Sequence, residues 1–390
     1  MNTPAPRPTI RLKTDRAPGH PWVWSAQIVK PDDKLPPGSV VDIVHAKGGF
    51  VGRGFWNGHA RVALRVLTTN VDEAVDEAWI AARIARAVDL RRTALRLDEQ
   101  SDAWRVVHSE GDGLSGLVVD RYANHLVVEY FAAGMWRFRD TIHAELLRHF
   151  PGSSLYWFAE QHVQRQESFD VRSGEAPDVV EVHEHGLRFL AAPGLGHKTG
   201  FFADQRDNRR RFAELARGRR VLDLCCNAGG FAVHAMAAGA REAIGVDADA
   251  AILEVARANA TLNGVEATFE QGDVFEWLRA AIARGETYDA IVLDPPKLTR
   301  DRNQVVAALK KYFAMNRTAL DVVAPGGILL TCSCTGLVSE GDFVEMIRRV
   351  SLNAGREIQI LQSAGAGADH PVASTVPEGR YLKAIFCRVD

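Results

Sequence analysis

One short stretch constrains the fold more than any other: residues 221–231 read Val-Leu-Asp-Leu-Cys-Cys-Asn-Ala-Gly-Gly-Phe. The first four residues have the pattern of a buried strand, and the two glycines allow the backbone to turn sharply. The apolar residues after Gly230 predict a helix whose free N-terminal amides face the turn. A strand, a glycine turn and a helix in this order predict a nucleotide-binding site at the edge of a parallel sheet.

The region after residue 195 alternates short apolar runs with helical patterns, which is typical of βαβ units and a parallel sheet. One helix is expected to begin at Ala250 and to stop before Gly264, although Asn259 interrupts its apolar stripe. The strands that we expect cover residues 220–224, 242–246, 267–271, 290–293 and 327–332, with two more near 357–361 and 382–389.

Acidic residues follow three of these expected strands, at the edge where ligands bind in such sheets. Asp247 is placed to accept hydrogen bonds from ribose hydroxyls. Asp273 is placed to accept the amino group of an adenine, with Val274 against the ring. Asp294 opens an Asp-Pro-Pro-Lys stretch, which a dinucleotide site would not explain. A dehydrogenase is also disfavoured because residues 227–232 do not fit G-x-G-x-x-G.

Length and composition bound the class of protein. The 390 residues suggest two or three domains, and 46% hydrophobic and 25% charged residues are typical of a soluble globular protein. The first ten residues lack the apolar run of a signal peptide, and no stretch is apolar enough for a membrane span. Five cysteines do not resemble a disulfide framework, so we expect a cytoplasmic protein. His183, His185 and the cysteines are not spaced like the four ligands of a zinc site, so we expect no metal.

We expect three domains: a β-barrel over residues 1–72, an α+β domain over 73–190 and the α/β sheet over 191–390. The first alternates apolar runs with Gly and Pro turns and resembles the RNA-binding PUA domain; a structural β-module without a ligand is the alternative. Residues 1–66 carry ten basic side chains against four acidic ones, and residues 206–220 carry seven arginines against two acids. Each cluster is a candidate for phosphate contact or for a solvated face.

Further motifs narrow the interpretation. They are K-T-G-F-F-A-D-Q-R at 198–206, T-C-S-C-T at 331–335, the E-G-D turn and G-L-V-V-D at 110–120, A-D-H-P at 368–371 and P-E-G-R-Y-L-K at 377–383. With Asp-Pro-Pro-Lys, they resemble the large-subunit rRNA cytosine-5 methyltransferase I family along nearly the whole chain. The resemblance implies a Rossmann-like class I methyltransferase sheet with a central α+β domain and an N-terminal PUA-like β-barrel. It also implies S-adenosylmethionine as cofactor and large-subunit rRNA as partner.

The turn and strand-end residues, together with the T-G-F-F-x-D-Q-R segment of that family, define the expected cofactor site. From local sequence alone, the latter segment could equally be a loop and a helix N-cap at Asp204. The expected contacts are Phe201, Phe202, Asp204, Arg206, Asp223, Asn227, Ala228, Gly229, Gly230, Phe231, Asp247, Asp273, Val274 and Asp294.

Methylation of carbon 5 of cytosine needs a thiolate that adds to carbon 6, because carbon 5 is too weakly nucleophilic by itself. Cys334 matches the central residue of the family's S-C-S motif and lies further toward the open strand end, which favours it. Cys332 matches the T-C-S motif of a related RNA family and is the alternative. Asp294 is the expected acidic partner. Lys297 stands where the T-C-S family has a second cysteine, which leaves open the base that removes the carbon-5 proton.

Two other functions remain open at this point. The chain could methylate a guanine nitrogen in rRNA and use its cysteines structurally, or it could be an assembly factor that binds RNA without turnover. The target cytosine must leave its stack to reach a cysteine, so we expect unpaired or partly opened rRNA. The resemblance also raises the expectation of a homodimer.

Overall fold

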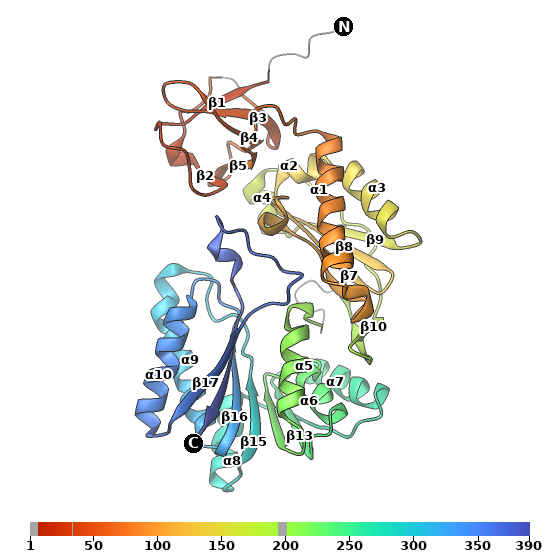
Figure 1. Ribbon diagram of the computed structural model, residues 1–390, viewed down its shortest axis with the longest axis vertical. Helices are drawn as coiled ribbons and strands as arrows, with labels where there is room; N and C mark the ends of the chain where they lie inside the picture. Colours follow the sequence, from red (N-terminus) through yellow and green to blue (C-terminus); the bar gives the residue numbers. More distant parts are fainter. Residues whose placement is uncertain (1–6, 33, 194–200) are drawn as a thin grey trace. The chain divides into compact units, whose positions relative to one another are not determined.

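A computed structural model describes residues 7–32, 34–193 and 201–390 (Figure 1). The chain divides into two compact units, which are described separately. The first comprises Met1–Glu99, Trp104–Pro177 and Asp369–Gly379, and the second comprises Gln100–Ala103, Asp178–Ala368 and Arg380–Asp390. The three domain boundaries expected from the sequence stay a prediction.

The first unit begins with the expected β-domain. Its five-stranded sheet has the order β1-β3-β4-β5-β2, in which β1 and β3 are parallel and the other pairs are antiparallel. Ile10, Val41 and Leu64 are buried in its core. The strands are β1 (Thr9–Arg11), β2 (Trp22–Trp24), β3 (Ser39–Val44), β4 (Phe50–Trp56) and β5 (Val62–Thr68).

The rest of the first unit is built on a second sheet, with the order β6-β7-β8-β9. Helix α1 (Glu77–Asp89) begins where the Asp76 carboxylate accepts the Trp79 amide, and a π-turn (Leu90–Ala94) follows it. The E-G-D residues 110–112 belong to a 3-10 turn (Ser109–Asp112). The other elements are β6 (Ala103–His108), β7 (Leu117–Tyr122), β8 (His125–Tyr130), β9 (Ser154–Phe158), α2 (Ala133–Arg137), α3 (Arg139–His149) and α4 (Gln161–Glu167).

The second unit contains a seven-stranded sheet of order β14-β13-β12-β15-β16-β18-β17, which confirms the expected α/β fold. Its first five strands are parallel, and β18 runs antiparallel to both of its neighbours. The strands are β12 (Arg220–Leu224), β13 (Glu242–Asp247), β14 (Thr268–Gln271), β15 (Tyr288–Leu293), β16 (Val323–Ser333), β17 (Ile358–Ala364) and β18 (Lys383–Val389); a hairpin of β10 (Val180–Glu184) and β11 (Leu187–Ala191) precedes them.

Helices cover this sheet (Figure 1), which is why its central strands are nearly continuous apolar runs. Side chains of α8 (Val274–Ala283), α9 (Val305–Leu320) and α10 (Glu340–Ala354) share one core cluster with the sheet. Helices α5 (Arg206–Leu215), α6 (Gly230–Ala237) and α7 (Ala250–Leu262) follow one another in contact. The strand order reverses between β12 and β15, so ligands are expected beyond the carboxyl ends of these two strands.

Candidate active site

The turn that follows β12 has a constrained backbone. Cys225 and Asn227 adopt the left-handed conformation, with φ of 60° and 50°, and Gly229 follows with φ of 75°. Left-handed residues other than glycine are uncommon and concentrate at functional turns. The amide of Asn227 donates to Oδ2 of Asp247 over 3.0 Å, which ties the turn to the end of β13.

Asn259, which interrupts the apolar stripe of α7, supports the same turn. Its side chain is completely buried. Nδ2 donates to the carbonyl of Ala228 over 3.0 Å, and Oδ1 accepts the amide of Leu190 over 2.9 Å. Sequence reasoning assigned this residue no role, although a polar residue in an apolar stripe was the available signal.

Three buried oxygen atoms of predicted cofactor residues have no hydrogen-bond partner among the described residues: Oδ1 of Asp204, of Asp223 and of Asn227. Two of these side chains are held through their other oxygen, because Tyr381 Oη donates to Asp204 over 2.6 Å and the Ala232 amide donates to Asp223 over 3.1 Å. A buried acceptor without a donor is costly. The site is therefore suited to a ligand rich in donors, such as the ammonium, hydroxyl and amino groups of S-adenosylmethionine.

The other two strand-end acids are already engaged with backbone amides. Asp247 accepts the amide of Asp249 through Oδ1 as well as that of Asn227. Asp273 is the N-cap of α8, where its Oδ1 accepts the amides of Phe275 and Glu276 over 2.9 and 3.2 Å. Both carboxylates are thereby held in fixed orientations at the carboxyl edge of the sheet.

Glu184 is completely buried and joins two residues that lie far apart in the sequence. Its carboxylate accepts two hydrogen bonds of 2.6 Å from Arg209 and one contact of 2.9 Å from His234 Nε2. Burial raises the pKa of Glu184, but Arg209 and His234 outweigh burial and hold it well below its usual range. Arg209 is thus used inside the fold, so it differs from the solvated or phosphate-binding arginine that the basic cluster predicted.

Arg209 also positions the segment before α5. Its Nη1 donates to the carbonyl of Phe202 over 3.0 Å, and its guanidinium lies 5.0 Å from the ring centre of Phe201. Phe201 and Arg206 are buried, whereas Phe202 is exposed. The first three residues of the K-T-G-F-F motif, 198–200, lie outside the described residues.

The remaining predicted cofactor residues lie at the start of α6 and α8. Phe231 packs edge-on against Phe212, with ring centres 5.9 Å apart, so its ring belongs to the core. A side chain at Gly230 would come within 2.9 Å of Arg209, which explains the glycine there. Val274 is buried next to Asp273.

Asp294 follows β15 and stands beside the cysteine-bearing strand. Gln205 Nε2 donates to its Oδ2 over 2.8 Å. Burial, and then the charge of Asp204, raise the pKa of Asp294 to about 7, although the Gln205 hydrogen bond opposes them. Burial, together with the charges of Asp294 and Asp247, also raises the pKa of Asp223 to about 7. A large fraction of Asp294 is therefore protonated near neutral pH.

The two candidate cysteines differ in exposure. Cys332 is completely buried within β16, whereas Cys334 follows the end of this strand and is half-buried. Burial, then Asp294 and Asp204, raise the pKa of the Cys334 thiol to about 11, and the exposed Lys297 opposes this shift. Burial raises the pKa of the Cys332 thiol well above its usual value.

Residues on both sides of Cys334 are held by side chains that sequence reasoning did not assign. Ser333 Oγ donates to Tyr312 Oη over 3.0 Å, and Tyr312 Oη lies 2.9 Å from Thr335 Oγ1. Lys383 Nζ donates to the carbonyl of Thr335 over 2.7 Å. Lys383 belongs to the P-E-G-R-Y-L-K motif, but nothing in the local pattern of α9 marks Tyr312.

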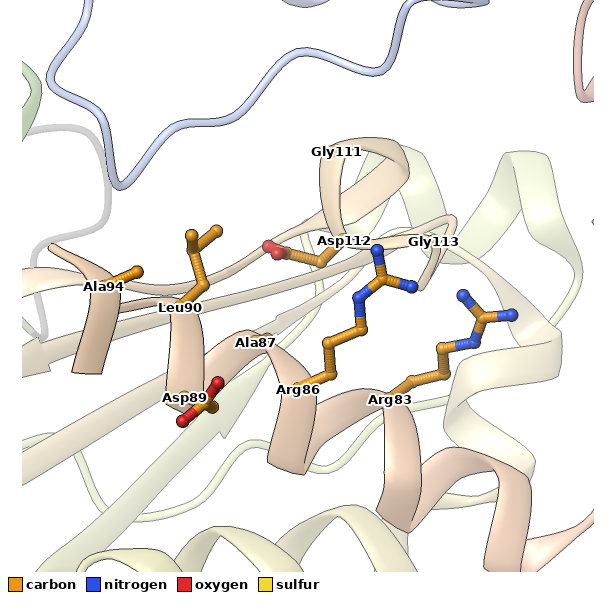
Figure 2. A pocket seen from close by; sticks show the side chains of 9 residues that line it. All are labelled: Arg83, Arg86, Ala87, Asp89, Leu90, Ala94, Gly111, Asp112 and Gly113. Atoms are coloured by element: carbon orange, nitrogen blue, oxygen red, sulfur yellow. The ribbon is translucent and has the colours of Figure 1, made fainter. Parts of the chain in front are cut away.

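A separate hollow of about 340 Å³ lies within the first unit (Figure 2). Arg83 and Arg86 extend from α1 toward the turn of Gly111 to Gly113. Asp112 also lines it, but Arg91 neutralises its carboxylate through contacts of 2.6 and 2.9 Å. Arg86 is exposed and has no ion-pair partner among the described residues. Arg83 pairs with Glu73 over 3.6 Å, and Asp89 also lines the hollow, so within the described part of the chain Arg86 is the guanidinium that it presents to solvent without an ion pair.

In the part of the chain that the structure describes, no cluster of His, Cys, Asp and Glu could hold a metal ion. Within the same residues, no helix has both the length and the apolar character to cross a bilayer.

Comparisons with known proteins identify the domains. The S-adenosylmethionine-dependent methyltransferase family matches residues 150–354, and the PUA-like domain matches residues 15–69. The ribosomal RNA large subunit methyltransferase I of Tolumonas auensis is 39% identical over 393 residues, covering 97% of this chain and 99% of the relative. The enzyme of the same name from Erwinia tasmaniensis is 36% identical over 378 residues, covering 95% of each chain.

Solved structures share the fold along nearly the whole chain. The methyltransferase SMU.776 in complex with SAH superposes with a TM-score of 0.82 and 20% identity, covering 98% of this chain and 99% of that chain. A SAM-dependent methyltransferase from Streptococcus mutans gives a TM-score of 0.81 at 19% identity, covering 98% and 100%.

Proposed function

Because the chain belongs to the ribosomal RNA large subunit methyltransferase I family of S-adenosylmethionine-dependent methyltransferases, we propose that it methylates carbon 5 of a cytosine in large-subunit rRNA. The observation that carries this proposal is the half-buried Cys334 beside Asp294 at the carboxyl edge of the sheet. A thiol and a carboxyl group are the two side chains that this reaction requires.

The cofactor would lie against the turn after β12. Asp204, Asp223 and Asn227 offer it the buried acceptors that have no other donor among the described residues. We assign the ribose hydroxyls to Asp247 and the adenine to Asp273 and Val274, as the strand order suggests. When bound, S-adenosylmethionine supplies the electrophilic methyl group.

Cys334 would act as the nucleophile. Its thiolate forms a bond to carbon 6 of the cytosine, and the electrons of the ring double bond move so that carbon 5 can take the methyl group. A base then removes the proton from carbon 5, the double bond re-forms, and the bond between sulfur and carbon 6 breaks. Cys332 is completely buried, which favours Cys334 for contact with a base.

Asp294 would donate a hydrogen bond to N3 of the cytosine while the ring gains electron density. This role needs the protonated carboxyl group, and burial with Asp204 raises its pKa to about 7. A protonated acid in a dry site can stabilise developing negative charge. Lys297 stays a candidate for positioning the base or its phosphate, because it is exposed beside Cys334.

We assign part of the RNA contact to the first unit. Arg83 and Arg86 line its hollow, and guanidinium groups bind phosphate well (Figure 2). The matching PUA-like domain supports an RNA partner. We place the enzyme in the cytoplasm, where its free cysteines would stay reduced. The homodimer expected from the resemblance stays a prediction for analytical ultracentrifugation.

The decisive test is methyl transfer from labelled S-adenosylmethionine to large-subunit rRNA that lacks its modifications, followed by nucleoside digestion and mass identification. The expected product is 5-methylcytosine. A methylated guanine would overturn the cytosine proposal and leave the cysteines structural. RNA binding without any transfer, unchanged by Asp247→Ala, would instead indicate an assembly factor.

A further inference from the structure

A basic segment follows the Asp-Pro-Pro stretch in the second unit. Residues 297–320 contain six basic side chains and one acidic one, Asp301, in a chain whose net charge is −2. Helix α9, which makes up most of this segment, has no acidic residue. The basic residues are Lys297, Arg300, Arg302, Lys310, Lys311 and Arg317. A local excess of positive charge of this kind is a candidate surface for a polyanion.

Most of this charge is not neutralised within the protein. Arg317 pairs with Asp321 over 2.6 Å, but the other five cations are exposed and make no ion pair among the described residues. Exposed arginines elsewhere in this unit do have such partners, as Arg348 has in Glu345 over 2.7 Å. An ordinary solvated helix face mixes both signs of charge, so the five unpaired cations point to an external anion.

The loop that carries Arg300 and Arg302 is held in one conformation by its own side chains. Thr299 is buried, and its Oγ1 accepts the amide of Asp301 over 2.9 Å and donates to the carbonyl of Asp301 over 3.0 Å. The Asp301 carboxylate is the N-cap of a 3-10 turn (Arg302–Gln304), where it accepts a backbone amide over 2.9 Å. The one acidic side chain of the segment is therefore engaged with the backbone.

The same loop is joined to the strand end that bears the candidate nucleophile. The amide of Leu298 donates to Oγ1 of Thr335 over 3.3 Å, and Thr335 directly follows Cys334. Tyr312 of α9 contacts the same atom, with its Oη 2.9 Å from Thr335 Oγ1. The loop and α9 are thus both fixed to the residue after Cys334, and the basic segment begins at the rim of the candidate active site.

The charge continues along one face of α9. Positions 302, 306 and 310 and positions 303, 307 and 311 are spaced by four residues, which places them on one side of a helix, and all six are exposed. Lys310 and Lys311 lie two turns beyond Arg302, about 12 Å along the axis. Glu340 and Asp342 begin the neighbouring helix α10, but neither makes an ion pair with this face among the described residues.

We propose that Arg300, Arg302, Lys310 and Lys311 form a basic strip that binds backbone phosphates of the rRNA strand beside the target cytosine. The proposal rests on the proposed function, because a base that reaches Cys334 stays attached to its strand. The phosphates next to that base must then lie at the rim of the site, where the strip offers unpaired positive charge. Arginine can bind phosphate through two parallel hydrogen bonds, and lysine binds it as a point charge.

The test measures binding of an unmodified large-subunit rRNA transcript to the full-length protein by filter binding across a salt series. One variant combines Arg300→Gln with Arg302→Gln, and a second combines Lys310→Gln with Lys311→Gln. The matched control combines Arg284→Gln with Arg348→Gln, which removes the same charge from exposed arginines of this unit that pair with Glu286 and Glu345. Lys297 is left unchanged because it also acts on the Cys334 thiol.

Each strip variant should reduce the slope of log affinity against log salt by about 1.4, if each side chain contacts one phosphate of a single strand. The same release of counterions corresponds to about a tenfold loss of affinity at 0.15 M salt. The KM for rRNA should rise by a similar factor while kcat stays close to the wild type, because the strip does not touch the reacting atoms. The control should keep the wild-type slope.

An unchanged slope in the Arg300 and Arg302 variant would overturn the proposal, and an unchanged slope in the Lys310 and Lys311 variant alone would overturn its α9 half. An equal loss in the control would reduce the effect to net charge and refute the strip. If the variants bind the transcript normally but transfer less methyl to ribosomal particles, the strip contacts a ribosomal protein instead, and the proposal fails.

The outcome is separable from that of the proposed function. If the methyl group is found on guanine while the strip variants still lower the slope, the cytosine proposal fails and the phosphate contacts stand. If 5-methylcytosine forms and the slopes do not change, the proposed function stands and the basic strip is refuted.

Discussion

Gln205 Nε2 donates a 2.8 Å hydrogen bond to Oδ2 of Asp294, which links the segment before α5 to the Asp-Pro-Pro-Lys turn after β15. The bond favours the charged form of the carboxyl group, whereas burial and Asp204 favour the neutral form. The balance places the pKa of Asp294 at about 7, so its protonation should be visible in the pH dependence of catalysis.

Activity should depend on a protonated Asp294 and an ionised Cys334. Because the pKa of Asp294 is about 7 and that of Cys334 is about 11, kcat/KM should rise with pH up to about 7 and then level off. Below pH 7 the fraction of Cys334 thiolate rises with pH while Asp294 stays protonated. Above pH 7 the fraction of thiolate still rises, but the fraction of protonated Asp294 falls by the same factor, so the two effects cancel. Methyl-transfer assays across the pH range check this.

Two variants test whether Asp294 causes the change of slope, or break, that we expect near pH 7 in the plot of log kcat/KM against pH. Asp294→Asn keeps a hydrogen-bond donor but does not titrate, so log kcat/KM should continue to rise through pH 7. Gln205→Leu removes the bond that favours the carboxylate, so the break should move to higher pH. If Asp294→Asn still showed the break at the same pH, a group other than Asp294 would be responsible for it.

The nucleophile can be identified with RNA that carries 5-fluorocytosine, which traps the covalent adduct because fluorine at carbon 5 cannot leave as a proton. Cys334→Ala should abolish the adduct, whereas Cys332→Ala should retain it, because Cys332 is completely buried. Denaturing gel electrophoresis detects the shifted band. An adduct that persists in Cys334→Ala and disappears in Cys332→Ala would reverse the assignment.

Asp223 should destabilise the protein as the pH rises, because its pKa is raised to about 7 in the folded chain from 3.8. The unfolded chain loses this proton first, so the penalty grows between these values and stays constant above about 7. Asp223→Asn should therefore raise the free energy of unfolding at pH 8 by up to about 4 kcal/mol, and by much less at pH 4. Urea unfolding at the two pH values checks this, and an equal gain at both would contradict it. The affinity of Asp223→Asn for S-adenosylmethionine should fall, because Asp223 is one of the expected cofactor contacts.

Arg83 and Arg86 should contribute salt-dependent RNA binding. Their double replacement by Ala should weaken binding and reduce the slope of log affinity against log salt by about 1.4, if each contacts one phosphate of a single strand. The matched control replaces Arg96 and Arg148, exposed arginines of the same unit that pair with Glu99 and Glu145. Equal losses in both double variants would indicate a general charge effect.

Much of the second unit could be predicted because its determinants are local. The apolar runs and the glycine turn placed the strands of the sheet within a few residues, and Gly264 marked the end of α7. The acidic strand-end residues follow from the same pattern, since parallel strands bring their carboxyl ends to one edge. The motifs predicted the family, and a relative that is 39% identical over 97% of this chain confirms it.

Local sequence determined which segments form strands and helices, where the chain turns, and which residues end at the edge of the sheet. Only the tertiary structure decided which side chains meet there: Asn259 on Ala228, Arg209 on Glu184, and Lys383 on Thr335. The physical reason is that periodicity reports the burial of a residue, whereas hydrogen bonds and charge effects depend on neighbours that lie many residues away. For Lys383, the partner is 48 residues earlier in the chain, and the contact forms when β18 pairs with β16.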